Sequence, residues 1–160
     1  MRYFLDCEFD GHAGPLLSLA LVSEVGLGLH VRTQARASDP WVIENVEPLM
    51  DNHRAHLQVE CEINQVGGKI RAFLGIDDAP VIIADSPVDI GRFCTAISTG
   101  EDGGWASADY PRMTFEVRNV DCYPTTLPGA VQHNAWWDAM ALREKLKDTS
   151  EASKSPGRSK

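Results

Sequence analysis

The first 36 residues contain three apolar segments that are separated only by short turns. Residues 1–9 and 16–23 have the composition of strands, and the sequence Asp-Gly-His-Ala-Gly-Pro between them is typical of a turn. A turn at 24–28 leads into a third expected strand near 28–36. Because consecutive strands joined by short turns pair antiparallel, the chain is predicted to begin as an antiparallel meander.

After residue 38 the pattern changes to alternating helices and strands. Asp39 and Pro40 suit the N-cap and first position of a helix, and Pro87 suits the start of another. The run Val-Ile-Ile-Ala at 81–84 is typical of a buried strand in a parallel position. We predict helices at 40–50, 56–75, 87–98 and 134–147, and a further strand at 113–120. These elements indicate an α/β protein with a mixed sheet and flanking helices.

One domain is expected at 1–147. The chain has 160 residues, of which 43% are apolar, and this suffices for one domain with a core. Residues 99–109 have the polar, Gly-rich composition of a loop. Residues 148–160 contain no large apolar residue and are predicted to be a disordered polar tail.

Composition narrows the class of protein. No segment approaches the roughly 18 apolar residues of a membrane span, so no membrane partner is expected. The charge of Asp6 interrupts the N-terminal apolar stretch, which favours a cytoplasmic protein over an exported one.

The cysteines are Cys7, Cys61, Cys94 and Cys122. They form no C-x-x-C pair and are expected to be reduced thiols. The net charge of -8 argues against a protein that coats nucleic acid, but not against an enzyme that grips a short strand.

Asp6 and Glu8 lie two residues apart in the first expected strand. Alternation places both carboxylates on one face, whereas Leu5, Cys7 and Phe9 face the other way. Neighbouring carboxylates repel each other, and a metal ion between them removes that repulsion. A solvent-facing edge strand is the alternative explanation for this pair.

Four more polar residues occur near expected helix starts. Asp89 falls in the first turn of the helix at 87–98, where a carboxylate also interacts favourably with the helix N-terminus. Asp85 is a competing candidate that could instead cap this helix. His133 precedes the last helix and Asp138 lies in its early turns, although a histidine there is commonly a cap or a surface residue. With the pair on the first strand, these residues could hold two divalent cations beside a general base, the equipment for phosphodiester cleavage.

These residues resemble the pattern of the DEDD exonuclease superfamily, in its histidine subclass (DEDDh). That family has Asp-x-Glu on its first strand, an Asp in a middle segment, and a final His-x-Ala-x-x-Asp-Ala. Here residues 6–8 read Asp-Cys-Glu, the middle acid is Asp89, and residues 133–139 read His-Asn-Ala-Trp-Trp-Asp-Ala. The resemblance covers nearly the whole chain apart from the tail.

The middle segment departs from the family pattern. Family members often have His-Asn-x-x-Phe-Asp there, whereas residues 84–89 read Ala-Asp-Ser-Pro-Val-Asp. Asp89 aligns with the final Asp and is the favoured site residue. Asp85 takes the place of the Asn, and whether it substitutes for Asp89 stays open.

The resemblance implies an RNase H-like sheet and a two-metal 3′-to-5′ exonuclease that releases nucleoside 5′-monophosphates. Two Mg2+ or Mn2+ ions would lie about 3.5–4 Å apart, with Asp6 bridging both. Glu8 and Asp138 would complete the site of one ion, and Asp89 would hold the other. His133 would take a proton from the attacking water, since an imidazole suits the role of a base at neutral pH. Oxygen ligands match such hard cations.

Within the superfamily, the short length and the opening residues 1–9 are similar to small bacterial 3′-to-5′ exoribonucleases, of which one actinobacterial group prefers adenylate-containing RNA. RNase T and oligoribonuclease are more distant relatives. The resemblance implies 3′ ends of single-stranded RNA as substrate and a homodimer as the assembly. Two alternatives stay open: an exonuclease or proofreading factor for single-stranded DNA with the same site, and a catalytically silent nucleic-acid-binding module.

Three residues are predicted to contact the substrate. Cys7 and Phe9 flank the first acidic pair and are expected to touch the terminal nucleotide, although core packing is the alternative for Phe9. Trp105, in the Gly-rich loop, is expected to stack on a base. Trp136 and Trp137 lie on an apolar helix and are more simply explained as core residues.

Overall fold

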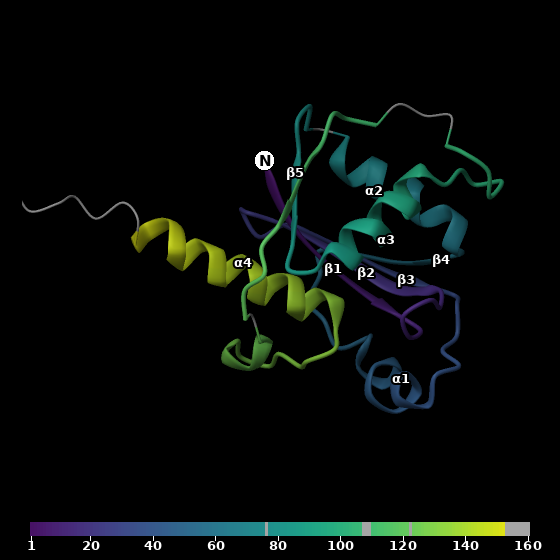
Figure 1. The fold of residues 1–160 in the computed structure, drawn as a ribbon, viewed down its shortest axis with the longest axis horizontal. Helices are drawn as coiled ribbons and strands as arrows, with labels where there is room; N and C mark the ends of the chain where they lie inside the picture. The colour runs from purple at the N-terminus through teal and green to yellow at the C-terminus, as the bar shows by residue number, and fades with distance from the viewer. Residues whose placement is uncertain (76, 107–109, 122, 153–160) are drawn as a thin grey trace, which may run out of the picture.

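The computed structural model describes residues 1–75, 77–106, 110–121 and 123–152. Helices cover both faces of a six-stranded mixed sheet with the strand order β4-β3-β2-β1-β5-β6 (Figure 1). The strands are β1 (Arg2–Phe9), β2 (Leu16–Ser23), β3 (Gly28–Thr33), β4 (Leu57–Cys61), β5 (Val81–Ala84) and β6 (Thr114–Val117). The helices are α1 (Pro40–Asn45), α2 (Val66–Leu74), α3 (Pro87–Ser98) and α4 (Ala135–Ala152). The predicted α/β class is confirmed.

Strand pairing leaves one half of β1 open on one side. β1, β2 and β3 form the predicted antiparallel meander, and β5 runs parallel to β1. On β1, the residues that pair with β5 are Arg2, Tyr3 and Phe4, at the start of the strand. The chain that follows β5 therefore passes beside the second half of β1, which carries Asp6 and Glu8.

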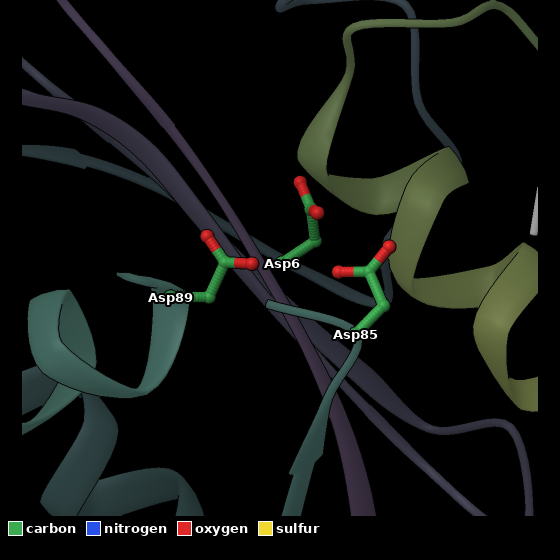
Figure 2. Close-up of side chains that lie close together, drawn as sticks. All are labelled: Asp6, Asp85 and Asp89. Atoms are coloured by element: carbon green, nitrogen blue, oxygen red, sulfur yellow. The ribbon is translucent and has the colours of Figure 1, made fainter. Parts of the chain in front are cut away.

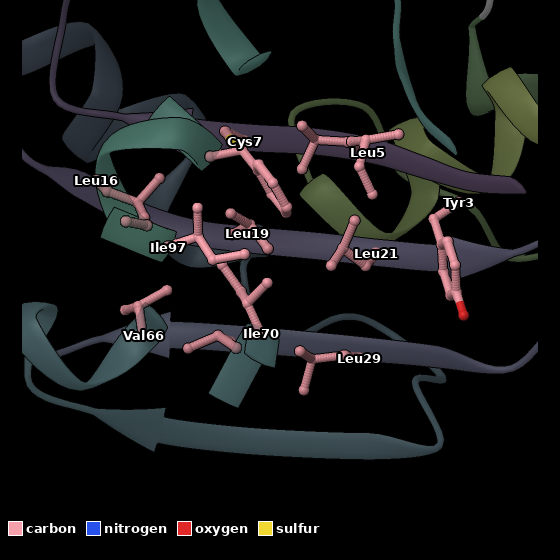
Figure 3. Close-up of a cluster of buried hydrophobic side chains, with 14 of the residues drawn as sticks. Tyr3, Leu5, Cys7, Leu16, Leu19, Leu21, Leu29, Val66, Ile70 and Ile97 are labelled. Atoms are coloured by element: carbon pink, nitrogen blue, oxygen red, sulfur yellow. The ribbon is translucent and has the colours of Figure 1, made fainter. Parts of the chain in front are cut away.

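The first face of the sheet packs against α2 and α3 and forms the main apolar core (Figure 3). Leu5, Leu19 and Leu21 are fully buried there, as alternation along the strands predicts. Gly67 lets the two helices approach closely, because a Cβ at this position would lie 2.2 Å from the carbonyl oxygen of Ala96. Gly67 is thus part of the contact between α2 and α3.

The second face of the sheet packs against α4. Ala20 and Val22 of β2 form a cluster with Trp136 and Trp137, which are buried as predicted. Gly28 of β3 admits the Trp136 ring, since a Cβ there would lie 2.2 Å from the ring. No helix in the described residues is both long and apolar enough to cross a membrane.

The predicted helix at 56–75 is wrong in its first part, where β4 forms the sheet edge beside β3. Leu57, Val59 and Cys61 alternate with polar residues, but the helical spacing that continues into α2 masked this short period-2 signal. β4 pairs parallel with β3, a non-local contact that local spacing does not reveal. The helical part is confirmed as α2, after a 3-10 turn at Ile63–Gln65.

Three other element boundaries differ from the prediction. The helix expected at 40–50 stops at Asn45 and continues as a 3-10 turn at Glu47–Leu49, because Pro48 has no backbone N–H to donate. The third strand ends at Thr33 rather than near 36, and the strand expected at 113–120 covers Thr114–Val117.

The end of the chain also departs from the prediction. α4 continues to Ala152, into the segment expected to be disordered, since a polar helix satisfies its own backbone hydrogen bonds. The remainder of the predicted tail, 153–160, lies outside the described residues. Cys7, Cys61 and Cys94 are free thiols, as predicted, and Cys122 lies outside the described residues.

Candidate metal site

The first group of candidate metal ligands comes from β1 and α4. Asp6, Glu8 and Asp138 each offer a carboxylate oxygen, and these oxygens lie within 4.8 Å of one another. Alternation puts both β1 acids on the face that α4 covers. Their cross-strand partners on β2 are the small residues Ala20 and Ser18, which leave room for the carboxylates. The structure thus brings together three of the acids that the sequence singled out.

The second group adds two acids that follow β5. Asp85 comes directly after β5, and Asp89 lies in the first turn of α3. Figure 2 shows both carboxylates beside Asp6, and the oxygens of the three residues lie within 4.8 Å of one another. Sequence reasoning treated Asp85 and Asp89 as competitors, but both reach Asp6. Asp85 is not the cap of α3, because Ser86 takes that place by accepting a hydrogen bond from the Val88 N–H.

Asp6 is the member that both groups share, and its charge is the least favourable. Burial and the nearby carboxylates, Glu8 foremost, raise the pKa of Asp6 well above its usual range. Burial and Asp138 raise the pKa of Glu8 to about 8, and burial and Asp85 raise the pKa of Asp89 to about 7. When ionised, these groups carry more negative charge than the surrounding protein neutralises, so cations would bind favourably.

His133 lies immediately before α4 and is exposed. It lines a cavity together with the carboxylates of both groups. Its backbone has φ 58°, the left-handed conformation that few residues other than glycine adopt. Asn134 caps α4, because its side-chain oxygen accepts hydrogen bonds from the N–H groups of Trp136 and Trp137 at 3.1 and 3.3 Å. The alternative reading of His133 as the helix cap is therefore wrong.

Two aromatic residues beside the site were not predicted. The Trp41 ring meets the His133 ring edge-on, with 5.1 Å between their centroids, and it is 54% exposed. Tyr123 is 65% exposed and lines the cavity of about 320 Å3 that the carboxylates share. Neither residue has a sequence signal, since Trp41 meets His133 from the start of α1 and Tyr123 reaches the cavity from a loop, and both positions depend on the whole fold.

The predicted contacts Cys7 and Phe9 both line this cavity, but in different ways. The Cys7 thiol is buried in the main core, where it donates to the carbonyl oxygen of Asp89 at 3.9 Å. Phe9 is half-buried, and the Arg92 guanidinium lies 4.7 Å from its ring centroid. Arg92 also donates to the carbonyl oxygens of His12 and Gly14, so it fastens the turn after β1 to α3.

The predicted contact Trp105 does not line this cavity. It forms a bridge with Thr99, which caps the far end of α3. Asp89 lies at the near end, ten residues earlier, so a helical rise of about 1.5 Å per residue separates the two ends by about 15 Å. The 88% exposure of Trp105 fits a loop residue, but composition could not tell which end of α3 the loop occupies.

The acids at this cavity come from β1, the segment after β5, α3 and α4, which are elements far apart in the sequence. A scan of the sequence against models of known protein families found no match, and a search against curated proteins found none either. The case for a function therefore rests on these side chains and their arrangement.

Proposed function

We propose that this protein is a metal-dependent 3′-to-5′ exoribonuclease of the DEDDh type with an RNase H-like fold. The observation that carries the proposal is the position of Asp6 in both groups of carboxylates. Two groups of ligands with one shared member suit two adjacent cations, the arrangement used for phosphodiester hydrolysis.

The chemistry of the side chains favours Mg2+ or Mn2+. Both groups consist only of carboxylates, and hard cations prefer oxygen ligands. Asp6 would contribute to both ions, Glu8 and Asp138 to one, and Asp85 and Asp89 to the other. When bound, the two ions activate a water molecule and stabilise the leaving 3′ oxygen.

His133 is the proposed general base. It is exposed, lines the cavity that holds the carboxylates, and can take a proton from the attacking water. Trp41 limits how the imidazole can move, because the two rings are in contact. Its exposed surface also offers a face on which the terminal base can stack.

The substrate class and assembly follow from the resemblance of the sequence to small bacterial exoribonucleases. We propose single-stranded RNA with a free 3′ end as the substrate, because the opening residues 1–9 are similar to those of that group. The homodimer and the cytoplasmic location stay predictions. Light scattering of the purified protein would measure its mass and decide the first of these.

A time course on 5′-labelled single-stranded RNA tests the proposal, with a DNA of the same sequence run in parallel in Mg2+ and in Mn2+. Asp6→Ala removes the shared ligand. Asp78→Ala is the matched control, because Asp78 is an exposed acid in the turn before β5. We expect the wild type and Asp78→Ala to shorten RNA from its 3′ end, and Asp6→Ala to leave it intact.

The other outcomes separate the alternatives. Shortening of DNA alone would assign the site to a DNA exonuclease. Binding of RNA without hydrolysis in either metal would contradict the enzyme and favour a silent binding module.

A further inference from the structure

The start of α4 is tied to a segment that sequence reasoning left without a role. Asn134 is completely buried, and its side-chain amide donates to the carbonyl oxygens of Leu49 and Met50 at 2.6 and 3.3 Å. The Trp137 indole donates to the carbonyl oxygen of Asn52 at 2.7 Å. Three backbone carbonyls, those of residues 49, 50 and 52, therefore hold the start of α4.

Residues 49–53, which we call the anchor segment, are themselves fixed to the sheet. Met50 is buried in an apolar cluster with Leu17 of β2. Asp51 forms an ion pair with Arg32 of β3. The His53 ring packs against the His30 ring of β3 at a tilt of 39°, with 4.1 Å between the ring centroids. These contacts give the anchor segment a defined position relative to the strands.

On the β3 side, the contact between the two histidines lies in the interior of the fold. His30 is 1% exposed, and neither of its ring nitrogens has a hydrogen-bond partner among the described residues. Burial and the nearby His53 lower its pKa to about 3, so the ring is neutral at ordinary pH. The contact with the anchor segment therefore places no charge on His30 in the interior of the fold.

Asn134 connects this anchor to Asp138 of α4 and to His133, which precedes the helix. Its own N–H donates to the Asp138 carboxylate at 3.0 Å. It also follows His133, whose left-handed backbone persists only if the neighbouring residues hold it. The direction of one carboxylate and the position of the imidazole therefore both depend on where Asn134 is fixed.

The same sheet thus positions both halves of the candidate site by two routes. β1 carries Asp6 directly. β3 is linked to α4 because His30 contacts the anchor segment, whose carbonyls accept hydrogen bonds from the Asn134 amide. Across the sheet, Asp6 of β1 lies opposite Ala20 of β2, which lies opposite His30 of β3. A shift of the anchor would move α4 relative to β1 and separate the ligands of the first group.

We propose that Asn134 is a positioning residue, which sets His133 and Asp138 against the β1 carboxylates through the carbonyls of the anchor segment. This inference rests on the proposed function for its catalytic consequence. Its structural content is independent, since the position of the start of α4 can be measured without any hydrolysis.

The variant Asn134→Ser tests this role. Serine keeps a hydroxyl that can cap α4 but is too short to donate to both carbonyls. Asn64→Ser is the matched control, because Asn64 also donates its side-chain amide to a distant carbonyl, that of Glu101, and does not line the carboxylate cavity. The measurements are kcat and KM on single-stranded RNA, amide hydrogen exchange at 133–138, and the imidazole proton resonances of His133.

In Asn134→Ser we expect kcat to fall about tenfold to a hundredfold, because displacing a catalytic group by about 1 Å can cost about 100-fold. KM should stay within about twofold, since the carboxylates and aromatic surfaces that bind substrate remain. Exchange at 133–138 should be faster, and the His133 resonances should move as the Trp41 ring contact loosens. Asn64→Ser should match the wild type in all three.

A kcat within about twofold of the wild type, with unchanged His133 resonances, would overturn the proposal. A fall in kcat that Asn64→Ser reproduces would also overturn it, because general destabilisation would then explain the effect. If the wild type does not hydrolyse RNA, the proposed function fails, and the exchange and the resonances still decide the positioning role. If Asn134→Ser does not fold, Trp137→Phe removes the indole donor to Asn52 while it keeps an aromatic ring, and it should give a smaller effect of the same sign.

Discussion

The two faces of β1 place neighbouring residues in opposite environments. Toward α2 and α3, Leu5 is fully buried among apolar side chains of the main core. Toward α4, Asp6 and Glu8 meet Asp138 instead of an apolar partner. The strand is the same and the residues are adjacent, so the difference arises only from the alternation of side chains.

This comparison separates stability from function along one strand. Burial of apolar surface on the first face stabilises the fold. On the second face, burial and repulsion make the carboxylates unfavourable in the metal-free protein. Substitutions of apolar residues on the first face should therefore lower stability. Replacement of a carboxylate on the second face by an uncharged side chain should raise stability and remove activity.

The largest expected effect is that of Asp6→Asn. Loss of the shared ligand should remove about 4 kcal/mol of transition-state stabilisation, which is roughly a 1000-fold fall in kcat. The melting temperature without metal should rise, because a buried and repelled charge is replaced by a neutral group. Rate measurements and thermal melts in EDTA check both. A lower melting temperature would show that the acid stabilises the fold, which would break the comparison.

The neighbouring substitution Leu5→Ala should have the opposite pattern. Removing a fully buried side chain from the main core should cost about 2–5 kcal/mol of the free energy of unfolding. Activity per folded molecule should change little at a temperature where the variant remains folded. Urea denaturation measures the first quantity. If the folded variant loses activity as strongly as Asp6→Asn, the two faces are not independent.

A smaller loss of stability is expected for Gly28→Ala on the α4 side. The added Cβ would lie 2.2 Å from the Trp136 ring, and relief of such overpacking typically costs about 1–3 kcal/mol. Since α4 would shift away from the sheet, activity should also fall. Gly91→Ala is the matched control, because a Cβ there meets nothing within 4 Å. Equal melting temperatures for the two variants would contradict this account of the helix contact.

The smallest expected effect is the pH dependence of the metal-free protein. The pKa of Glu8 is raised to about 8 and that of Asp89 to about 7, so the stability present at acid pH is lost as the pH rises toward 8. From pH 6.5 to 8 we expect a loss on the order of 1 kcal/mol, or about 2–4 °C in melting temperature. The pKa values of His30 and His53 are lowered, and these groups act in the other direction. Their contribution to stability is lost as the pH falls below about 6.5, the pKa of histidine in the unfolded chain.

Added Mn2+ should reverse the loss at pH 8, because it binds the ionised carboxylates and stabilises the folded state. Glu8→Gln should flatten the slope above pH 6.5. A melting temperature that rises from pH 6.5 to 8 in EDTA would contradict the burial of uncompensated acids.

Much of the fold could be predicted from local pattern. β1, β2 and β5 follow from their apolar runs, and Pro87 marks the start of α3. β4 could not be predicted in this way, because its place at the sheet edge depends on a parallel partner more than twenty residues away.

The candidate site could be predicted only in part. Asp6, Glu8 and Asp138 stand out through spacing and resemblance, and the structure brings them together. That Asp85 and Asp89 would both reach Asp6 depends on how β5 ends beside β1. Trp41 and the Asn134 amide carry no signal at all, since their contacts join segments about ninety residues apart.

The central claim is that Asp6 is shared between two cation sites, and anomalous X-ray diffraction from crystals grown with Mn2+ tests it most directly. Two anomalous peaks should appear in the carboxylate cavity, both in contact with Asp6, one beside Glu8 and Asp138 and the other beside Asp85 and Asp89. Peaks elsewhere, or a single peak that Asp6 does not touch, would contradict the two-cation account.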